Sequence, residues 1–188
     1  MKKRCSWCEG SDLYRSYHDK EWGMPLHDDD KLFEFLVLES FQAGLSWSTI
    51  LNKREAFRLA FDDFDAAKIV NYNEEKIFEL LNNAHIIRNR LKINATVHNA
   101  ETYLHIKKKY GSFDKYIWQF TDFKVIKNAW STEDDIPPTS PVSDKMSKQL
   151  KKDGFKFVGT TICYAYLQAI GAVNDHITSC FRYHEVGV

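Results

Sequence analysis

Two cysteines and two histidines stand at opposite ends of the chain, Cys5 and His18 near the start and His176 and Cys180 near the finish. Thiolates and imidazoles in this combination are the usual ligands of a tetrahedral structural zinc ion. One ion bound by all four would tie the two ends of the chain together, which restricts the fold to those with adjacent termini. Four protein ligands leave no open position for a substrate, so this zinc would stabilise the protein without reacting.

The two halves of this set differ in how well their spacing suits one ion. His176 and Cys180 are four residues apart and could lie on one face of a helix, whereas Cys5 and His18 need a turn between them. Cys8 forms a Cys-x-x-Cys pair with Cys5 and could replace a ligand or support redox chemistry. Buried thiols and hydrogen-bonded imidazoles without a metal are the remaining alternative.

Composition limits the class of protein and its partners. The 188 residues are 44% hydrophobic and 14% aromatic, which suffices for a sizeable globular core. There is no long apolar run and no secretion signal, so we expect a cytoplasmic protein without a membrane partner. Positive and negative side chains balance at 26 each, so a nucleic acid would need a local basic surface; the lysines of 148–156 and the basic residues of 88–92 are candidates.

Apolar residues recur every three or four positions along most of the chain, and strand-like alternation is almost absent. This pattern predicts an all-α fold, which we take as a single domain over 1–188 with two helical lobes. Caps and glycines place the expected helices at 28–41, 46–61, 65–71, 74–83, 86–108, from 112 onward, 143–154 and 158–170. Three prolines in 131–141 indicate an extended connection.

Glu39 lies at an unexpected place in the first long helix. It falls on the same stripe as Leu32, Phe35 and Leu36, which should face the core. A buried carboxylate is costly unless it is paired or hydrogen-bonded. Glu39 therefore either caps nearby backbone groups or contacts a ligand.

Aromatic side chains gather around the same part of the sequence. Tyr14, Tyr17 and Trp22 cluster near one candidate zinc ligand, and Trp47 follows the turn after the helix that carries Glu39. Taken singly, such residues more often belong to a core. Together with a carboxylate they could form a stacking pocket that attracts a flat, electron-poor or cationic ring.

The segment from Gly154 to Thr161 predicts an apolar turn between two helices. The amides of Gly159, Thr160 and Thr161 would open the second helix and could bind a phosphate. The threonine hydroxyls and the Lys156 ammonium could join them, giving sequence-independent contact with a nucleic-acid backbone. A simple helical hairpin is the alternative.

With these motifs in place, the sequence resembles the 3-methyladenine DNA glycosylase I family of the helix-hairpin-helix DNA glycosylase superfamily. The resemblance covers nearly the whole chain. It rests on four ordered blocks, Tyr17-His-Asp-x-Glu-Trp-Gly23, Leu38-Glu39 with Gln42-Ala-Gly-Leu-Ser-Trp47, Gly154-Phe-Lys-Phe-Val-Gly-Thr-Thr-Ile-Cys-Tyr164, and Asn174-Asp-His-x3-Cys180.

The resemblance implies a role for each candidate residue. Glu39 would be the catalytic-site residue that hydrogen-bonds the base, and the stacking and lining residues would be Tyr14, Tyr17, Trp22 and Trp47. The structural zinc would be held by Cys5, His18, His176 and Cys180. Three positions depart from the family pattern, namely Phe41, His85 and Leu91, and they flank the four blocks.

The implied reaction is hydrolysis of the glycosidic bond of 3-methyladenine in alkylated double-stranded DNA, which releases the free base and leaves an abasic site. An N3-alkylated adenine is already cationic in its nucleoside, so its departure needs no general acid and selectivity can come from recognition of the flipped base. We expect a monomer, with Leu45 filling the gap in the duplex unless it is a core residue.

Asp175 is a second carboxylate candidate. Other glycosylases of the superfamily carry a catalytic aspartate after the hairpin, although Asp175 could instead orient His176. Two other functions remain open at this point, a zinc-stabilised module that binds DNA without catalysis and a metallohydrolase with an open zinc position.

Overall fold

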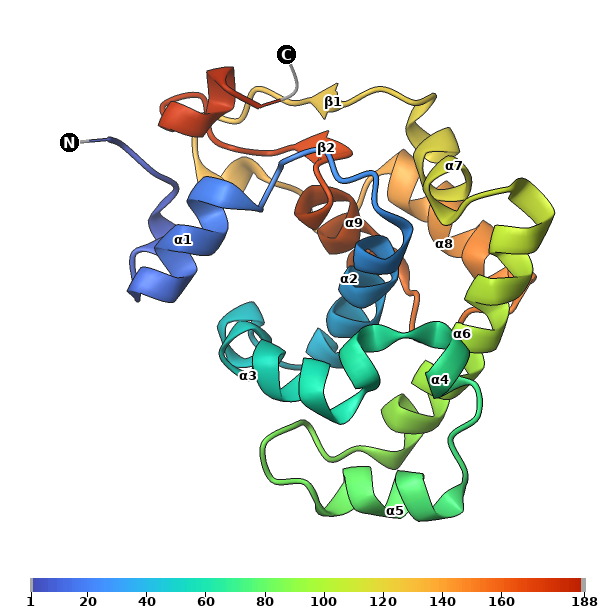
Figure 1. The fold of residues 1–188 in the computed structure, drawn as a ribbon. Coiled ribbons are helices and arrows are strands. Elements are labelled where there is room, and N and C mark those ends of the chain that lie inside the picture. The colour runs from blue at the N-terminus through green and yellow to red at the C-terminus, as the bar shows by residue number, and fades with distance from the viewer. Residues whose placement is uncertain (1, 187–188) are drawn as a thin grey trace.

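The computed structural model describes residues 2–186, and these are mostly helical, as the sequence predicted (Figure 1). Among them no helix is long and apolar enough to cross a membrane. The helices are α1 (Asp12–Lys20), α2 (Asp29–Gln42), α3 (Trp47–Ala60), α4 (Ala66–Ile69), α5 (Glu74–Asn82), α6 (Arg90–Tyr110), α7 (Phe113–Trp118), α8 (Pro141–Asp153) and α9 (Thr160–Ala169). Short 3-10 turns lie at Ser6–Cys8, Asp62–Phe64, Gln119–Thr121, Glu133–Asp135 and Phe181–His184.

Side-chain caps explain most of the helix starts. Asp28, one of three consecutive aspartates that the sequence offered as caps, accepts a hydrogen bond from the third residue of α2. Ser46 does the same for α3, as the sequence predicted. The start of α8 was predicted wrongly: Ser140 is the cap and Pro141 the first helical residue, a position where proline loses no hydrogen bond. The expected helix over 86–108 begins only at Arg90, and α1 was given no bounds from the sequence.

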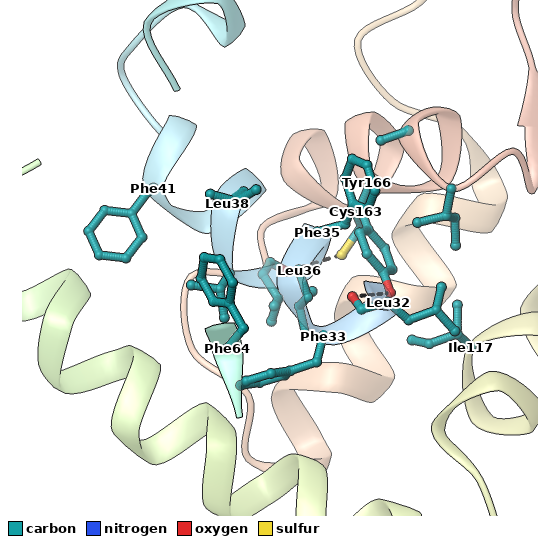
Figure 2. Packing of buried hydrophobic residues seen from close by; sticks show 14 of the residues in the cluster. Leu32, Phe33, Phe35, Leu36, Leu38, Phe41, Phe64, Ile117, Cys163 and Tyr166 are labelled. Atoms are coloured by element: carbon teal, nitrogen blue, oxygen red, sulfur yellow. Dashed lines mark hydrogen bonds between the residues drawn. The ribbon is translucent and has the colours of Figure 1, made fainter. Parts of the chain in front are cut away.

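Helix α2 is the centre of the packing. Every residue from Leu32 to Phe41 is buried, and the helix contacts α3, α6, α7 and α9. Figure 2 shows this core, including the Tyr166 hydroxyl on α9 that donates to the Leu32 carbonyl at 3.0 Å. A helix buried all round fixes its neighbours on several sides, so α2 can hold a functional side chain in a defined place.

The two ends of the chain lie together. The amide of Phe181 donates to the carbonyl of Lys3 at 2.8 Å. The expected all-helical architecture gains one small sheet here, since β1 (Ile126–Lys127) pairs in parallel with β2 (Val173–Asn174). This pairing draws the connection after α7 onto the segment that carries two of the candidate metal ligands.

Candidate active site

A cavity of about 350 Å³ opens between α1, α2, α3, α9 and the connection before α8. All five residues expected to line a base pocket do line it. Its walls are Trp7, Tyr14, Tyr17, Trp22, Glu39, Gln42, Trp47, Glu133, Ile136, Ala165 and Gln168. The sequence missed the contribution of the proline-rich connection, because nothing local indicates which way an extended segment folds back.

Trp7 is the aromatic wall that the sequence did not single out. Its ring lies 5.0 Å from Tyr14 and 5.0 Å from Trp22, measured between centroids, and 6.4 Å from Tyr17. The centroids of Tyr17 and Trp47 are 5.4 Å apart, so the aromatic contacts continue from Trp7 to Trp47. The position of Trp7 beside Cys5, a proposed ligand, was the one available signal.

Glu39 faces this cavity from the core. Its side chain is 2% exposed, and burial raises the pKa of its carboxyl to about 8. Within residues 2–186, its Oε2 atom and the Nε1 atom of Trp47 are buried without a hydrogen-bond partner. Buried polar groups are seldom left unpaired, because each costs about 1–3 kcal/mol. Because both residues line the cavity, their two unpaired polar atoms point to a ligand that can hydrogen-bond there.

Lys92 fixes the end of the helix that carries Glu39. Its ammonium donates to the carbonyls of Phe41 and Ala43 at 2.8 and 2.7 Å, which satisfies two groups that a helix end leaves free. Burial lowers the pKa of Lys92. Beyond this anchor Gly44 adopts a φ of 82°, and Leu45 is 41% exposed at the turn. Leu45 is thus a surface residue rather than a core one.

A buried ion pair supports the wall that Trp47 forms. Arg54 of α3 binds Glu34 at 2.7 Å and Glu21 at 2.6 Å. The guanidinium lies 4.8 Å above the ring of Phe35, and that ring stacks near Trp47 with centroids 6.4 Å apart. The sequence gave no indication of this network because its members lie on three separate segments.

The four candidate ligands come together, and all are buried. The ligand atoms of Cys5, His18, His176 and Cys180 lie within 4.8 Å of one another. The sulfur of Cys180 is 3.4 Å from His18 Nε2 and 3.6 Å from His176 Nδ1, and the sulfur of Cys5 is 3.8 Å from His176 Nδ1. Tetrahedral zinc would place such sulfur and nitrogen atoms about 3.6 Å apart, so this set could hold a metal ion.

Neighbouring groups orient both imidazoles toward this cluster. The Nδ1 atom of His18 pairs with Asp19 at 2.8 Å, and Nε2 of His176 pairs with the carbonyl of Trp22 at 3.2 Å. Such outer partners fix the ring orientation of a metal-binding histidine. Gly23 is required beside them, because a Cβ there would lie 3.0 Å from His176 Nε2 and the backbone φ is 79°.

Cys8 lies outside the cluster. Its thiol donates to the carbonyl of Cys5 at 3.1 Å, and burial raises its pKa to about 11. A buried thiol with a raised pKa is a poor nucleophile, which disfavours redox chemistry at the Cys-x-x-Cys pair.

The hairpin between α8 and α9 is held by side chains from α6 and α8. Asn99 bonds both the amide and the carbonyl of Lys156, and Ser147 donates to the carbonyl of Val158. Helix α9 begins at Thr160 with Gly159 as its cap, two residues later than predicted. The Thr160 hydroxyl donates to Asp144, so the structure uses that side chain within the hairpin.

Asp175 is fully buried, and in the described chain its side chain makes no hydrogen bond to His176. Its two oxygens instead accept four hydrogen bonds at 2.6–2.7 Å, from Asn128, Trp130, Tyr164 and Gln168. The interpretation that Asp175 orients His176 is therefore not supported.

These features define a helical protein with an aromatic-lined cavity that contains a buried carboxyl group and lies on the same chain as a helical hairpin. The chain belongs to the methyladenine glycosylase family, whose model matches residues 7–183. It is 46% identical over 181 residues to DNA-3-methyladenine glycosylase 1 of Escherichia coli K12, covering 96% of this chain and 97% of that protein.

Two solved structures show the same fold over almost the full length. A crystal structure of 3-methyladenine DNA glycosylase I has 49% sequence identity and a TM-score of 0.93, covering 95% of this chain and 98% of that one. The Staphylococcus aureus 3-methyladenine DNA glycosylase I, studied for its recognition of 3-methyladenine, is 36% identical with a TM-score of 0.91 and 95% of each chain covered.

Proposed function

We propose that this protein is a DNA-3-methyladenine glycosylase that hydrolyses the N-glycosidic bond of 3-methyladenine in alkylated DNA. The observation that carries the proposal is the buried, unpaired carboxylate oxygen of Glu39 in an aromatic cavity. Family membership supports it, as does the presence of 3-methyladenine bound to a relative that is 36% identical.

The reaction follows from the charge of the damaged base. In the nucleoside, 3-methyladenine is cationic and is therefore a good leaving group without protonation. The enzyme flips the nucleotide, stacks the base against the aromatic walls that include Tyr17 and Trp47, and lets Glu39 accept a hydrogen bond from it. Burial favours the protonated form of Glu39 in the free protein, and a cationic base in the same low-dielectric cavity favours the carboxylate. The carboxylate and the cationic base then attract each other strongly, whereas neutral adenine gains less from the same site.

The cavity requires the base to leave the duplex. The hairpin can hold the DNA backbone through the amides of Thr160 and Thr161 and through the ammonium of Lys156. Leu45, exposed at the turn after α2, is placed to fill the gap left by the flipped base. We assign this work to a single monomeric domain acting on double-stranded DNA.

The metal cluster has a structural role in this scheme. Cys5, His18, His176 and Cys180 would hold a zinc ion whose chemistry is to cross-link the two ends of the chain. His18 directly follows Tyr17 in α1, so a fixed imidazole also fixes a wall of the base pocket. Four protein donors leave no site for a reacting water, which disfavours a metallohydrolase.

The test is to analyse the bases that the purified protein releases from methylated DNA by chromatography. We expect free 3-methyladenine from the wild type, and at least a hundredfold lower rate from Glu39→Gln and Trp47→Ala with folding intact. DNA binding without release of any base would instead identify a non-catalytic DNA-binding module. Undiminished release by both variants would refute the site assignment.

A further inference from the structure

Gln168 is the one cavity residue whose side-chain amide is bonded to a buried carboxylate among residues 2–186. It lies near the end of α9 and lines the cavity together with Glu39 and Trp47. Its Nε2 atom donates to Oδ2 of Asp175 at 2.7 Å. A carboxylate oxygen surrounded by donors accepts and does not donate, so the nitrogen of the Gln168 amide must face Asp175.

The opposite end of the amide is then the carbonyl oxygen. Within the described chain, Oε1 of Gln168 has no hydrogen-bond partner and is not among the buried unpaired atoms, so it remains accessible. The cavity thus offers a second acceptor besides Glu39, and the fold fixes its polarity through Asp175.

We propose that Gln168, oriented by Asp175, is a specificity-determining residue that accepts a hydrogen bond from the exocyclic amine of the flipped base. This inference rests on the proposed function. The amine at C6 of 3-methyladenine carries two N–H groups, which match two acceptors, Glu39 and Gln168. In 3-methylguanine C6 carries an oxygen, which accepts hydrogen bonds and cannot donate one. This oxygen would face two other acceptors, which is unfavourable.

Asp175 acts only through Gln168 and is therefore a positioning residue. Asn128 and Trp130 donate to its other oxygen at 2.7 Å, and Tyr164 donates to the same oxygen as Gln168 at 2.6 Å. These donors come from the connection after β1 and from α9. They hold the carboxylate so firmly that the Gln168 amide cannot turn over without losing a bond to a buried charge.

The decisive variant is Gln168→Met, which keeps the length of the side chain and removes its acceptor. Asp175 retains the Tyr164 hydroxyl on Oδ2, so no buried charge is left without a donor. We expect the kcat/KM for 3-methyladenine to fall about tenfold, the effect of one lost hydrogen bond, and that for 3-methylguanine to change by less than about threefold. Both bases are quantified by chromatography from the same methylated DNA.

Gln149→Met is the matched control. Gln149 of α8 makes the same kind of bond, from Nε2 to Asp153 Oδ2 at 2.7 Å, but it lies outside the cavity. Its substitution should leave both rates and their ratio unchanged. In Asp175→Asn, the new amide can donate a hydrogen bond to Gln168, which allows the Gln168 amide to turn over. This variant should therefore also lower the preference for 3-methyladenine.

An unchanged ratio of the two rates in Gln168→Met would overturn the inference, whether both rates fall together or neither falls. If that variant does not fold, Gln168→Asn withdraws the oxygen by one methylene and must reduce the same ratio. Failure of the wild type to release any methylated base would refute the proposed function itself, which is a different result.

Discussion

Glu39→Gln should change the pH dependence of stability in a direction that the burial of Glu39 sets. Burial raises the pKa of the carboxyl from 4.5 to about 8, so the native state binds the Glu39 proton more tightly than the unfolded chain does. The stability that this proton contributes is complete below pH 4.5 and is lost as the pH rises through 8. Each tenfold difference in proton affinity is worth about 1.4 kcal/mol.

Between acid pH and pH 7, the free energy of unfolding of the wild type should therefore fall by about 3 kcal/mol more than that of Glu39→Gln. Between acid pH and pH 9 the difference should be about 5 kcal/mol, because glutamine stays neutral. Urea unfolding of both proteins at pH 5, 7 and 9, with equal zinc present, measures this difference. All other titrating groups are shared and cancel.

Glu75→Gln is the control, because this glutamate is exposed on α5 and its substitution should give a curve parallel to that of the wild type. Parallel curves for the wild type and Glu39→Gln would refute the reasoning. They would mean that water or another group already solvates the carboxylate in the free protein.

Three further predictions concern the supports of the pocket. Cys180→Ser should lower both the melting temperature and the excision activity, and stabilising substitutions elsewhere in the chain should restore the activity. If such a stabilised, metal-free variant had an intact pocket but stayed inactive, the metal would have a direct role in the reaction. Lys92→Met should destabilise by about 2–3 kcal/mol in urea unfolding, because two helix-end carbonyls lose their donor; an unchanged midpoint would contradict this. Trp7→Ala should weaken the binding of free 3-methyladenine about tenfold, measured by quenching of the remaining tryptophans, and equal affinity would show that Trp7 does not line the bound state.

Local patterns were enough to predict most of the helices and to select four residues that cluster in the structure. The caps Asp28 and Ser46 gave correct starts for α2 and α3 because capping depends on three or four consecutive residues. The four metal-ligand candidates were identified by residue type, and the structure places them within one cluster. Pro141 misled the prediction, since a proline can either break a helix or begin one.

The identity of the pocket residues followed from local anomalies and from the resemblance of four sequence blocks. Glu39 was conspicuous because a carboxylate on an apolar helical stripe needs a reason. The pairings that give the pocket its properties were not visible in this way. The bond between Gln168 and Asp175 and the placement of Trp7 depend on elements that meet only after folding.

By itself, the sequence determined the helical class, the family and the four residues able to tie the chain ends together. Only the tertiary structure decided that Cys8 stands apart, that the Thr160 hydroxyl is already used, and that Glu39 is buried with one oxygen unpaired. The physical reason is that residue type and periodicity are local properties, whereas burial and hydrogen-bond partners arise from segments distant in the chain. The packing of these distant segments therefore decides which polar groups line the pocket and how they are oriented.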